Sequence, residues 1–323
     1  MESLTPNSPA PGDAAILRLS NCQLCGSDDL LGLGDFNSSN ETIEKSLGVT
    51  GKSHWCVCAK CNFTFQNPRL SRAYQERWYE NSCYRTMSTT EVISQGYISF
   101  APAQLARFYT WLHSAGFDLK QIQNACCLDY GCGIGGALNF LADWNNQIYG
   151  VELDRALAEY GNKHYRIQIV PRVADLPANK EFGLIFSHNA IEHIYDPNEF
   201  FDFAARRLHR AGIMILVIPA WRYANTSLAL DAFNWSHNCI YDHVSLAGFL
   251  NKHGFFMASH LYQNPAPDGD WEICCLAYKS TRKNYYVSSV EEVFRELHVN
   301  IRHRAADRDA NPIKAGDRLS VKA

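Results

Sequence analysis

The second half of the chain alternates short apolar runs with stretches of helical periodicity. The apolar runs predict strands at residues 125–129, 147–152, 167–170, 183–187 and 214–218. Helical patterns lie between them, for example at residues 155–163 and 199–208. Strands that alternate with helices predict an α/β fold with a doubly wound, mostly parallel sheet. The unbroken apolar run at residues 213–218 also suits a strand that is covered on both faces.

Two further apolar runs, residues 255–262 and 271–279, follow this alternation. Residues 264–269 between them are Asn, Pro, Ala, Pro, Asp and Gly, a composition typical of turns. We therefore expect a hairpin at the edge of the sheet. Ligands of open α/β sheets bind beyond the carboxyl ends of the strands, so the loops that follow the predicted strands are expected to carry the functional residues.

The first predicted strand ends in a glycine-rich turn. The sequence there is Leu128-Asp129-Tyr130-Gly131-Cys132-Gly133-Ile134-Gly135-Gly136, and a helical pattern follows at residues 137–144. Glycine lets bare backbone approach a bound nucleotide-like ligand at such a turn. Gly131, Gly133 and Gly136 also fit the dinucleotide fingerprint G-x-G-x-x-G, so the glycines alone leave more than one cofactor open. A glycine turn without any ligand is a further alternative.

The charge of Asp129 separates the two cofactors. NAD would present a pyrophosphate to this turn, and the Asp129 carboxylate would repel that group. S-adenosylmethionine (SAM) has no phosphate and carries an ammonium and a sulfonium, so an acid at this position favours SAM. Glu152 ends the next apolar run and suits the ribose hydroxyls of either ligand.

Composition limits the classes of partner. Hydrophobic residues make up 46% and charged residues 20% of the 323 residues, as in ordinary globular proteins, and the formal net charge is −3. There is no overall basic field to attract nucleic acid, and no apolar run long enough to span a membrane, so we expect neither partner. Residues 1–13 lack the apolar core of a signal peptide. Twelve cysteines then indicate a reducing compartment, and we expect a cytoplasmic protein.

Four of the cysteines form two C-x-x-C pairs near the start of the chain. Cys22 and Cys25 make the first pair, and Cys58 and Cys61 make the second, a spacing that resembles a zinc ribbon. A module of roughly 50 residues buries little core, and bound zinc would supply the missing stability. We therefore expect a structural zinc ion, with Cys56 as an alternative to Cys58. Packed or free thiols are the competing interpretation.

Residues 121–282 resemble a class I SAM-dependent methyltransferase domain. In this family the sheet has seven strands, and the seventh is antiparallel. The matching motifs, in order, are the turn 129–135, Glu152 after 148–151, Ala174-Asp175-Leu176-Pro177, Phe182-Gly183-Leu184-Ile185-Phe186-Ser187 running into His188-Asn189-Ala190-Ile191-Glu192-His193, Ser245-Leu246, and His253-Gly254-Phe255.

The resemblance implies a role for each matched position. Residues of the glycine turn would line the methionine end of SAM, Glu152 would bind the ribose, and Asp175 with Leu176 would contact the adenine. Ser187 and His188 would form the floor near the sulfonium. The cofactor-binding residues expected on this basis are Asp129, Gly131, Gly133, Gly135, Glu152, Asp175, Leu176 and Ser187.

The cysteine module together with residues 62–69 resembles a group of bacterial methyltransferases that act on nucleotide-linked sugars or polysaccharide precursors. The resemblance implies a small, sugar-like acceptor and a histidine near it in each of two regions, which His193 and His237 match. Histidine suits removal of a proton near neutral pH, so we expect His237, His193 and His188 to be the catalytic residues. The nearby aromatic residues Tyr223, Phe233, Trp235 and Tyr241 would either stack on the acceptor or pack as a lid.

Alternative functions remain open at this point. The cysteine module could bind RNA in an RNA-modifying methyltransferase, with Lys52, Lys60, Arg69 and Arg72 as a small basic surface. A non-catalytic SAM-binding scaffold and an NAD-linked oxidoreductase are the other two alternative functions.

The expected organisation is a disordered lead-in (1–17), a zinc-ribbon-like module (18–70), a helical connector that covers the cofactor (71–120), the methyltransferase domain (121–282), and a helix with a polar tail (283–323).

Overall fold

The computed structural model describes residues 16–36, 52–80, 110–144, 147–220, 233–263, 272–286, 289 and 291–295. Residues 1–15, 81–109 and 296–323 lie outside the described residues, and with them much of the predicted lead-in, connector and tail. Among the described residues, no helix combines the length and the apolar character needed to cross a membrane.

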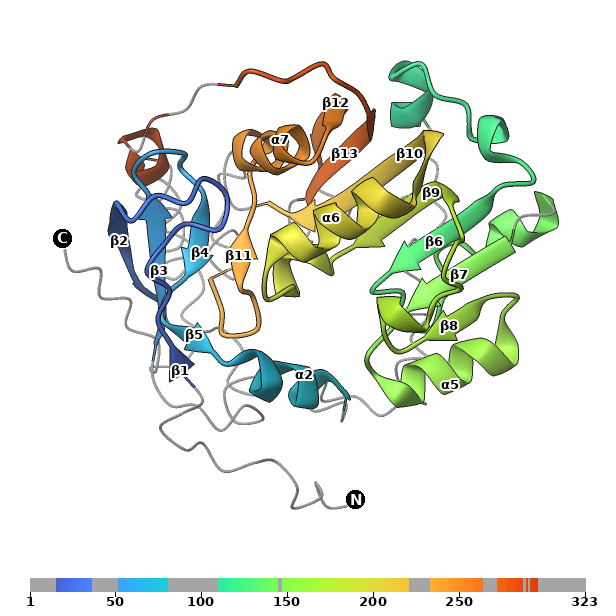
Figure 1. The fold of residues 1–323 in the computed structure, drawn as a ribbon, viewed down its shortest axis with the longest axis horizontal. Coiled ribbons are helices and arrows are strands. Elements are labelled where there is room, and N and C mark those ends of the chain that lie inside the picture. Colours follow the sequence, from blue (N-terminus) through green and yellow to red (C-terminus); the bar gives the residue numbers. More distant parts are fainter. Residues whose placement is uncertain are drawn as a thin grey trace, which may run out of the picture.

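A seven-stranded sheet forms the larger part of the fold (Figure 1). Its strand order is β12-β13-β10-β9-β6-β7-β8. Neighbours from β10 to β8 pair in parallel, whereas β13 runs antiparallel to both β10 and β12. This confirms the predicted doubly wound, mostly parallel sheet with an edge hairpin. The strands are β6 (Cys126–Tyr130), β7 (Gln147–Val151), β8 (Gln168–Val170), β9 (Phe182–His188), β10 (Leu208–Pro219), β12 (Phe255–Gln263) and β13 (Glu272–Lys279).

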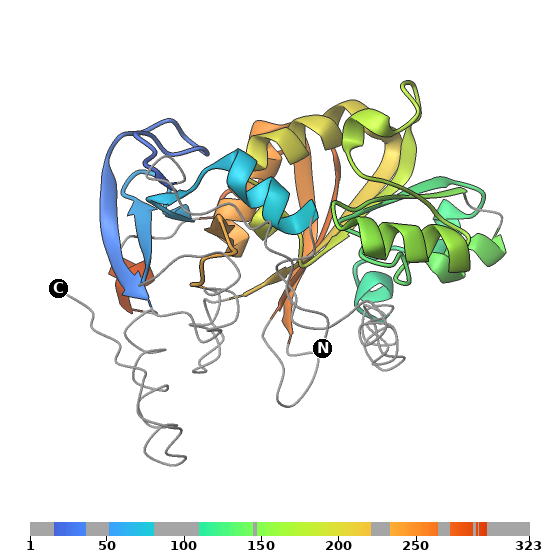
Figure 2. The same cartoon turned by 90° about the horizontal axis from the view of Figure 1, so that it is seen from below.

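Both faces of this sheet are covered, as the unbroken apolar strands require. Along β10, Met214 and Leu216 belong to one core, while Ile213 and Ile215 belong to a second core on the opposite face. The first core includes side chains of helices α6 (Pro197–Arg207) and α7 (His243–Lys252), and Figure 2 shows α6 lying over the sheet. The second core includes Trp111. Helix α5 (Arg155–His164) contacts β8.

Two local predictions differ from the structure. The predicted helix at 137–144 is the 3₁₀ segment η3 (Asn139–Trp144). The predicted range buries Leu138 and Leu141, which are spaced i, i+3. This spacing fits both an α-helix and a 3₁₀ helix, so the pattern could not separate the two helix types. The helix predicted to reach residue 208 ends at Arg207, because Leu208 already pairs with Phe182 as the first residue of β10.

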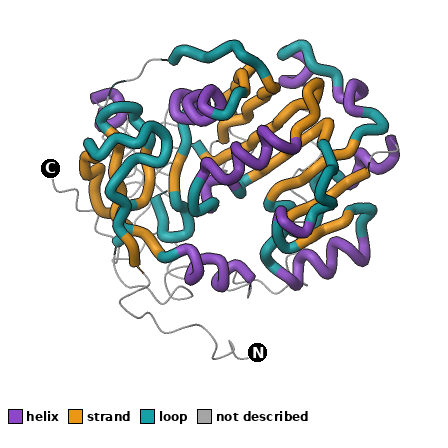
Figure 3. The backbone as a smooth tube through the Cα atoms, viewed as in Figure 1, coloured by secondary structure: helices purple, strands orange, loops and turns teal. Residues whose placement is uncertain are grey.

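A second, four-stranded sheet stands beside the first, with the order β11-β4-β3-β2 (Figure 1 and Figure 3). Three of its strands come from the cysteine-containing region, namely β2 (Leu30–Phe36), β3 (Ser53–Cys58) and β4 (Thr64–Gln66). The fourth, β11 (Cys239–Ile240), follows β10 far along the chain and pairs antiparallel with β4. The short strands β1 (Ile16–Leu17) and β5 (Arg69–Leu70) pair separately, and α2 (Arg72–Glu80) follows β5.

Candidate functional site

The glycine turn after β6 requires glycine for both conformation and space. Gly131, Gly133 and Gly135 have φ angles of 74°, 54° and 78°. A Cβ atom on Gly131 would lie 2.3 Å from the Cβ of Ala190, so no larger residue fits there. The turn therefore packs directly against the loop after β9. This contact brings the loops after two neighbouring parallel strands together, as the predicted topology requires.

Glu152 holds the same turn from the end of β7. Its two carboxylate oxygens accept hydrogen bonds from the backbone N–H groups of Gly133 and Asp154, each at 2.8 Å. Burial raises the pKa of Glu152 to about 7, and these hydrogen bonds counteract that rise. The side chain is thus oriented at the turn before any ligand is present.

Asp129 is the buried acid of the turn. It is 2% exposed, and its Oδ2 atom has no hydrogen-bond partner in the described part of the chain. Burial, reinforced by the charge of Glu152, raises the pKa of Asp129 to about 8. A buried carboxylate without a donor is unfavourable unless a cation or a proton reaches it. The ammonium group of SAM is such a cation, so the residues present suit this cofactor.

The remaining predicted cofactor residues also follow the carboxyl ends of parallel strands. Asp175 ends η4 (Val173–Asp175) after β8 and is exposed, while the next residue, Leu176, is 4% exposed. Ser187 lies near the end of β9, where its hydroxyl donates to the Tyr130 carbonyl at 2.9 Å. The last residue of β9, His188, places Nε2 2.9 Å from Oε1 of Glu272 on β13.

His193 and His237 meet next to this edge of the sheet, although they are distant in sequence. His193 ends η5 (Ile191–His193), and its ring centroid lies 4.6 Å from that of His237. His193 Nδ1 lies 2.9 Å from the Ser236 carbonyl and 2.7 Å from the Tyr79 hydroxyl. A carbonyl only accepts, so Nδ1 carries the proton and Nε2 presents a lone pair. Burial lowers the pKa of His193 to about 4, so the ring is neutral at pH 7.

Glu192 lies beside this pair and was missed as a site residue. It is 1% exposed, and neither carboxylate oxygen has a hydrogen-bond partner among the described residues. Its Oε1 lies 3.6 Å from His193 Nε2, and burial raises its pKa to about 8. The sequence places Glu192 next to His193, but an acid beside a histidine in a loop carries no signal of burial. Only the packing of residues 233–240 over the loop could reveal it.

The segment that carries His237 is held by the cysteine-containing region and by α2. Ser53 donates its hydroxyl to the Phe233 carbonyl at 2.9 Å, and Gln66 donates its amide to the Asn234 carbonyl at 3.2 Å. Asn238 donates to Gln75 on α2 at 2.7 Å and to the His193 carbonyl at 2.8 Å. The second sheet and α2 thus position the residues around His237.

The aromatic residues of this segment pack inside the protein. Phe233, Trp235 and Tyr241 are at most 3% exposed, and Phe233 stacks on Phe36 with ring centroids 4.3 Å apart. Of the two interpretations of this aromatic segment, the structure supports packing and leaves these three rings unable to stack on an acceptor. Tyr223 lies outside the described residues.

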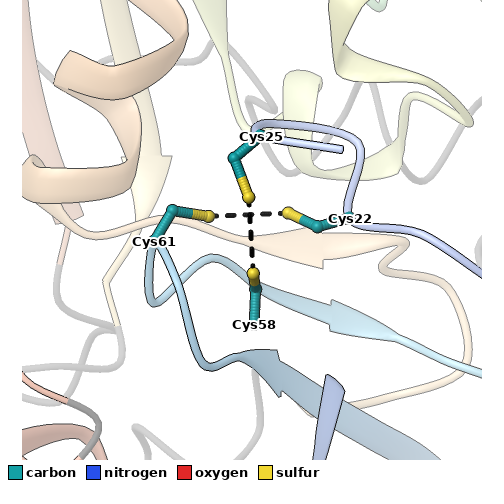
Figure 4. Close-up of side chains that lie close together, drawn as sticks. All are labelled: Cys22, Cys25, Cys58 and Cys61. Atoms are coloured by element: carbon teal, nitrogen blue, oxygen red, sulfur yellow. Dashed lines mark hydrogen bonds between the residues drawn. The ribbon is translucent and has the colours of Figure 1, made fainter. Parts of the chain in front are cut away.

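The four cysteines of the two C-x-x-C pairs converge on one point (Figure 4). Cys22 Sγ lies 3.5 Å from Cys61 Sγ, and Cys25 Sγ lies 3.5 Å from Cys58 Sγ. The pKa of Cys22 is lowered to about 5, chiefly by the Cys61 sulfur. This group could bind a metal ion. The structure selects Cys58 over Cys56, which is buried apart from the group and has its pKa raised to about 12 by burial.

Two residues of the predicted basic surface are engaged within the protein. Arg69 is fully buried, with its guanidinium carbon 4.0 Å from the centre of the Tyr195 ring. Arg72 donates to both carboxylate oxygens of Glu199, at 2.7 and 2.6 Å. The basic surface of this region is therefore smaller than the sequence indicates.

Comparison with known proteins supports one family. A family model described as a methyltransferase domain matches residues 97–260, which is half of the chain. No curated protein matches the sequence. Because the family match spans half of the chain and the sheet has the seven strands and antiparallel seventh strand expected for this family, the chain belongs to the class I SAM-dependent methyltransferases.

Three solved structures illustrate that similarity. One is the 1,6-didemethyltoxoflavin-N1-methyltransferase of Burkholderia thailandensis, at 12% identity and a TM-score of 0.49, over 68% of this chain and 97% of that one. The magnesium protoporphyrin IX methyltransferase of Synechocystis has 12% identity and a TM-score of 0.47, over 65% and 100%. A SAM-dependent methyltransferase of Mesorhizobium loti has 13% and 0.44, over 56% and 99%. The family match and the topology identify this protein as a SAM-dependent methyltransferase.

Proposed function

We propose that this enzyme transfers the methyl group of SAM to a hydroxyl of a nucleotide-linked sugar or a related polysaccharide precursor. The observation that carries the proposal is the pairing of His193 with His237 beside the loop that packs against the glycine turn. A neutral hydroxyl must lose a proton when it attacks the methyl carbon, so such an acceptor needs groups that promote proton loss. Two imidazoles next to the cofactor turn meet that need.

The cofactor would lie across the carboxyl ends of β6 to β9. Asp129 would bind the ammonium of SAM, and the backbone of Gly131, Gly133 and Gly135 would approach the methionine portion. Glu152 would accept from the ribose hydroxyls through the lone pairs that its two backbone hydrogen bonds leave. We propose that Asp175 and Leu176 contact the adenine, and that Ser187 lies near the sulfonium. These assignments follow the family pattern and the places of these residues after parallel strands.

The histidines would act at the acceptor end of the site. We propose that His193 and His237 promote loss of the acceptor proton. The tautomer of His193 supports this role, since its Nδ1 faces the Ser236 carbonyl and its Nε2 lone pair stays available. His188 would lie between cofactor and acceptor, oriented by its contact with Glu272. His188 ends β9, His193 lies in the loop after it, and His237 lies in the segment that covers this loop.

The four-cysteine group would hold a structural zinc ion. Four sulfur ligands complete a tetrahedral zinc site, so this ion would have no open position for a reactant. Its contribution would be to folding, on the order of 10–16 kcal/mol of binding energy in small zinc modules. Zinc held here would stabilise the second sheet, and through β4 and β11 it would support the segment that carries His237.

The proposed acceptor class is testable with methyl-labelled SAM. The purified protein is incubated with labelled SAM in the presence of each nucleotide-linked sugar of a panel. A separate incubation contains labelled SAM and bulk cellular RNA. We expect label in at least one sugar and none in RNA. His237→Ala and His193→Ala should each lower the rate at least 100-fold while affinity for S-adenosylhomocysteine (SAH) stays within about threefold. His54→Ala, at a partly exposed histidine that pairs with Asp35, is the matched control and should leave the rate unchanged. Labelled RNA without any labelled sugar would overturn the proposal.

A further inference from the structure

We propose that Glu192, His193 and His237 form a second metal site, which binds a first-row divalent cation such as Zn²⁺ or Mn²⁺. One ligand atom from each of the three residues lies within 4.8 Å of the other two. Two imidazoles and one carboxylate are a ligand set that such cations favour. The site is separate from the four-cysteine group and lies at the acceptor end of the catalytic edge.

The spacing of the ligand atoms fits a shared ion better than a direct hydrogen bond. Glu192 Oε1 and His193 Nε2 are 3.6 Å apart, which is too long for a hydrogen bond. Two ligands bound tetrahedrally at about 2.1 Å from one ion lie about 3.4 Å from each other. The cysteine group offers a comparison. Its sulfur atoms are 3.5 Å apart within each pair, whereas two sulfurs bound to one zinc ion are about 3.8 Å apart. In both groups the spacing is thus within a few tenths of an ångström of that in a metal site.

The protonation of His193 points to the same conclusion. Its Nδ1 proton is directed at the Ser236 carbonyl, 2.9 Å away, so Nε2 faces Glu192 with a lone pair. A lone pair and a carboxylate oxygen that face each other repel unless a cation or a proton lies between them. A backbone carbonyl that accepts from the far nitrogen is also the usual partner of a metal-bound histidine.

The surroundings of Glu192 provide an independent observation. Both of its oxygens are buried and have no hydrogen-bond partner among the described residues, and the residue is 1% exposed. Leaving a buried carboxylate unpaired is costly, and no donor in the described part of the chain relieves that cost. The side chain is directed at the two imidazoles instead. A divalent cation between them would satisfy the carboxylate and the Nε2 lone pair of His193 together.

The role of the ion rests on the proposed function, although its binding does not. Three protein ligands leave an open coordination position, which an acceptor hydroxyl could occupy. Coordination would lower the pKa of that hydroxyl, so its proton would pass to solvent more readily. The oxygen would then form its bond to the methyl carbon as the carbon–sulfur bond breaks, and the sulfur would keep the electron pair as SAH forms. His193 and His237 would thus promote proton loss through the ion.

Cobalt titration of the metal-free protein tests the site directly. We expect the wild type to bind two Co²⁺ ions per chain, one with an intense thiolate-to-cobalt absorption band and one without it. Glu192→Gln keeps the size of the side chain but removes its charge, and it should bind only the ion with the thiolate band. His237→Gln should behave in the same way and covers the case in which Glu192→Gln fails to fold. His54→Gln, whose ring pairs with Asp35 and belongs to neither group, should bind two ions.

Two results would overturn the proposal. The first is saturation of the wild type by the single thiolate-bound ion, which would mean that a proton, not a metal, lies between Glu192 and His193. The second is a second equivalent that persists in folded Glu192→Gln and His237→Gln, which would place it elsewhere. No acceptor is used in this titration, so a failure to methylate nucleotide sugars would overturn the proposed function and leave the metal site standing.

Discussion

Asp129 makes a quantitative prediction about cofactor affinity and pH. Its carboxyl is buried, and its pKa is raised to about 8 in the protein without cofactor. Only the ionised form attracts the ammonium group of SAH, the product that remains after methyl transfer. A bound proton therefore competes with the ligand. Affinity should be highest above the pKa and should be lost as the pH falls through it.

The size of the effect follows from the pKa values. A carboxyl with a pKa of about 8 is about half ionised at pH 8 and about 1% ionised at pH 6, so affinity should rise at least about 50-fold between these values. Glu152, with a pKa of about 7, titrates in the same range and adds to the rise. Asp129→Asn removes the larger contribution. Its affinity should be lower at pH 8, and its rise from pH 6 to pH 8 should not exceed about tenfold.

Titration calorimetry with SAH at pH 6, 7 and 8, at constant ionic strength, measures these affinities. Repeating the pH 7 titration in buffers of different ionisation enthalpy counts the protons released. The wild type should release about 1.4, of which about 0.9 come from Asp129 and about 0.5 from Glu152. A wild-type affinity that is flat from pH 6 to pH 8 would refute the reasoning. So would an Asp129→Asn variant with the full wild-type dependence, because the charge would then act elsewhere.

Two further predictions concern the glycine turn and the cysteine group. Gly131→Ala combines a left-handed backbone with a new Cβ only 2.3 Å from the Ala190 Cβ. It should cost about 2–4 kcal/mol of unfolding free energy and abolish SAH binding. Gly254→Ala is also left-handed but in open space, so in chemical denaturation it should cost only about 1–2 kcal/mol, and it should keep SAH binding. Removing the proposed zinc ion from the cysteine group should raise hydrogen exchange in residues 233–241 and stop methyl transfer while SAH still binds. Unchanged exchange there would contradict the proposed support through β11.

The arrangement of the proposed cofactor residues was predictable because its signals are local. Asp129, the glycine turn and Glu152 each lie at the end of an apolar run, and the position after a parallel strand determines where such residues gather. The cysteine group was equally readable, because the spacing within each C-x-x-C pair is set by a few neighbouring residues. The structure then added one choice, Cys58 over Cys56: both share a face of β3, but Cys58 ends the strand beside the turn that carries Cys61, whereas Cys56 lies one repeat earlier.

The arrangement of the proposed acceptor residues depends on long-range packing, and the sequence predicted less of it. His193 and His237 were identified as separate candidates, but their contact requires the segment before β11 to fold over the loop after β9. The burial of Glu192 arises from the same packing. Arg69 shows the converse, since a residue expected on a basic surface lies buried against Tyr195. In these cases residue type was informative, but burial and partner depended on distant segments.

The pairing of β11 with β4 has an evolutionary consequence. Cys239 and Ile240 complete a sheet whose other strands come from the first 66 residues, and Phe233 fits against Phe36. The amino-terminal region therefore does not form its sheet independently of the rest of the chain. If recombination replaced this region alone, the new region would have to pair with a β11 strand whose sequence fits the original β4. Lineages that exchange this region should show matched changes around residues 233–240, so the two stretches are expected to be inherited as one unit.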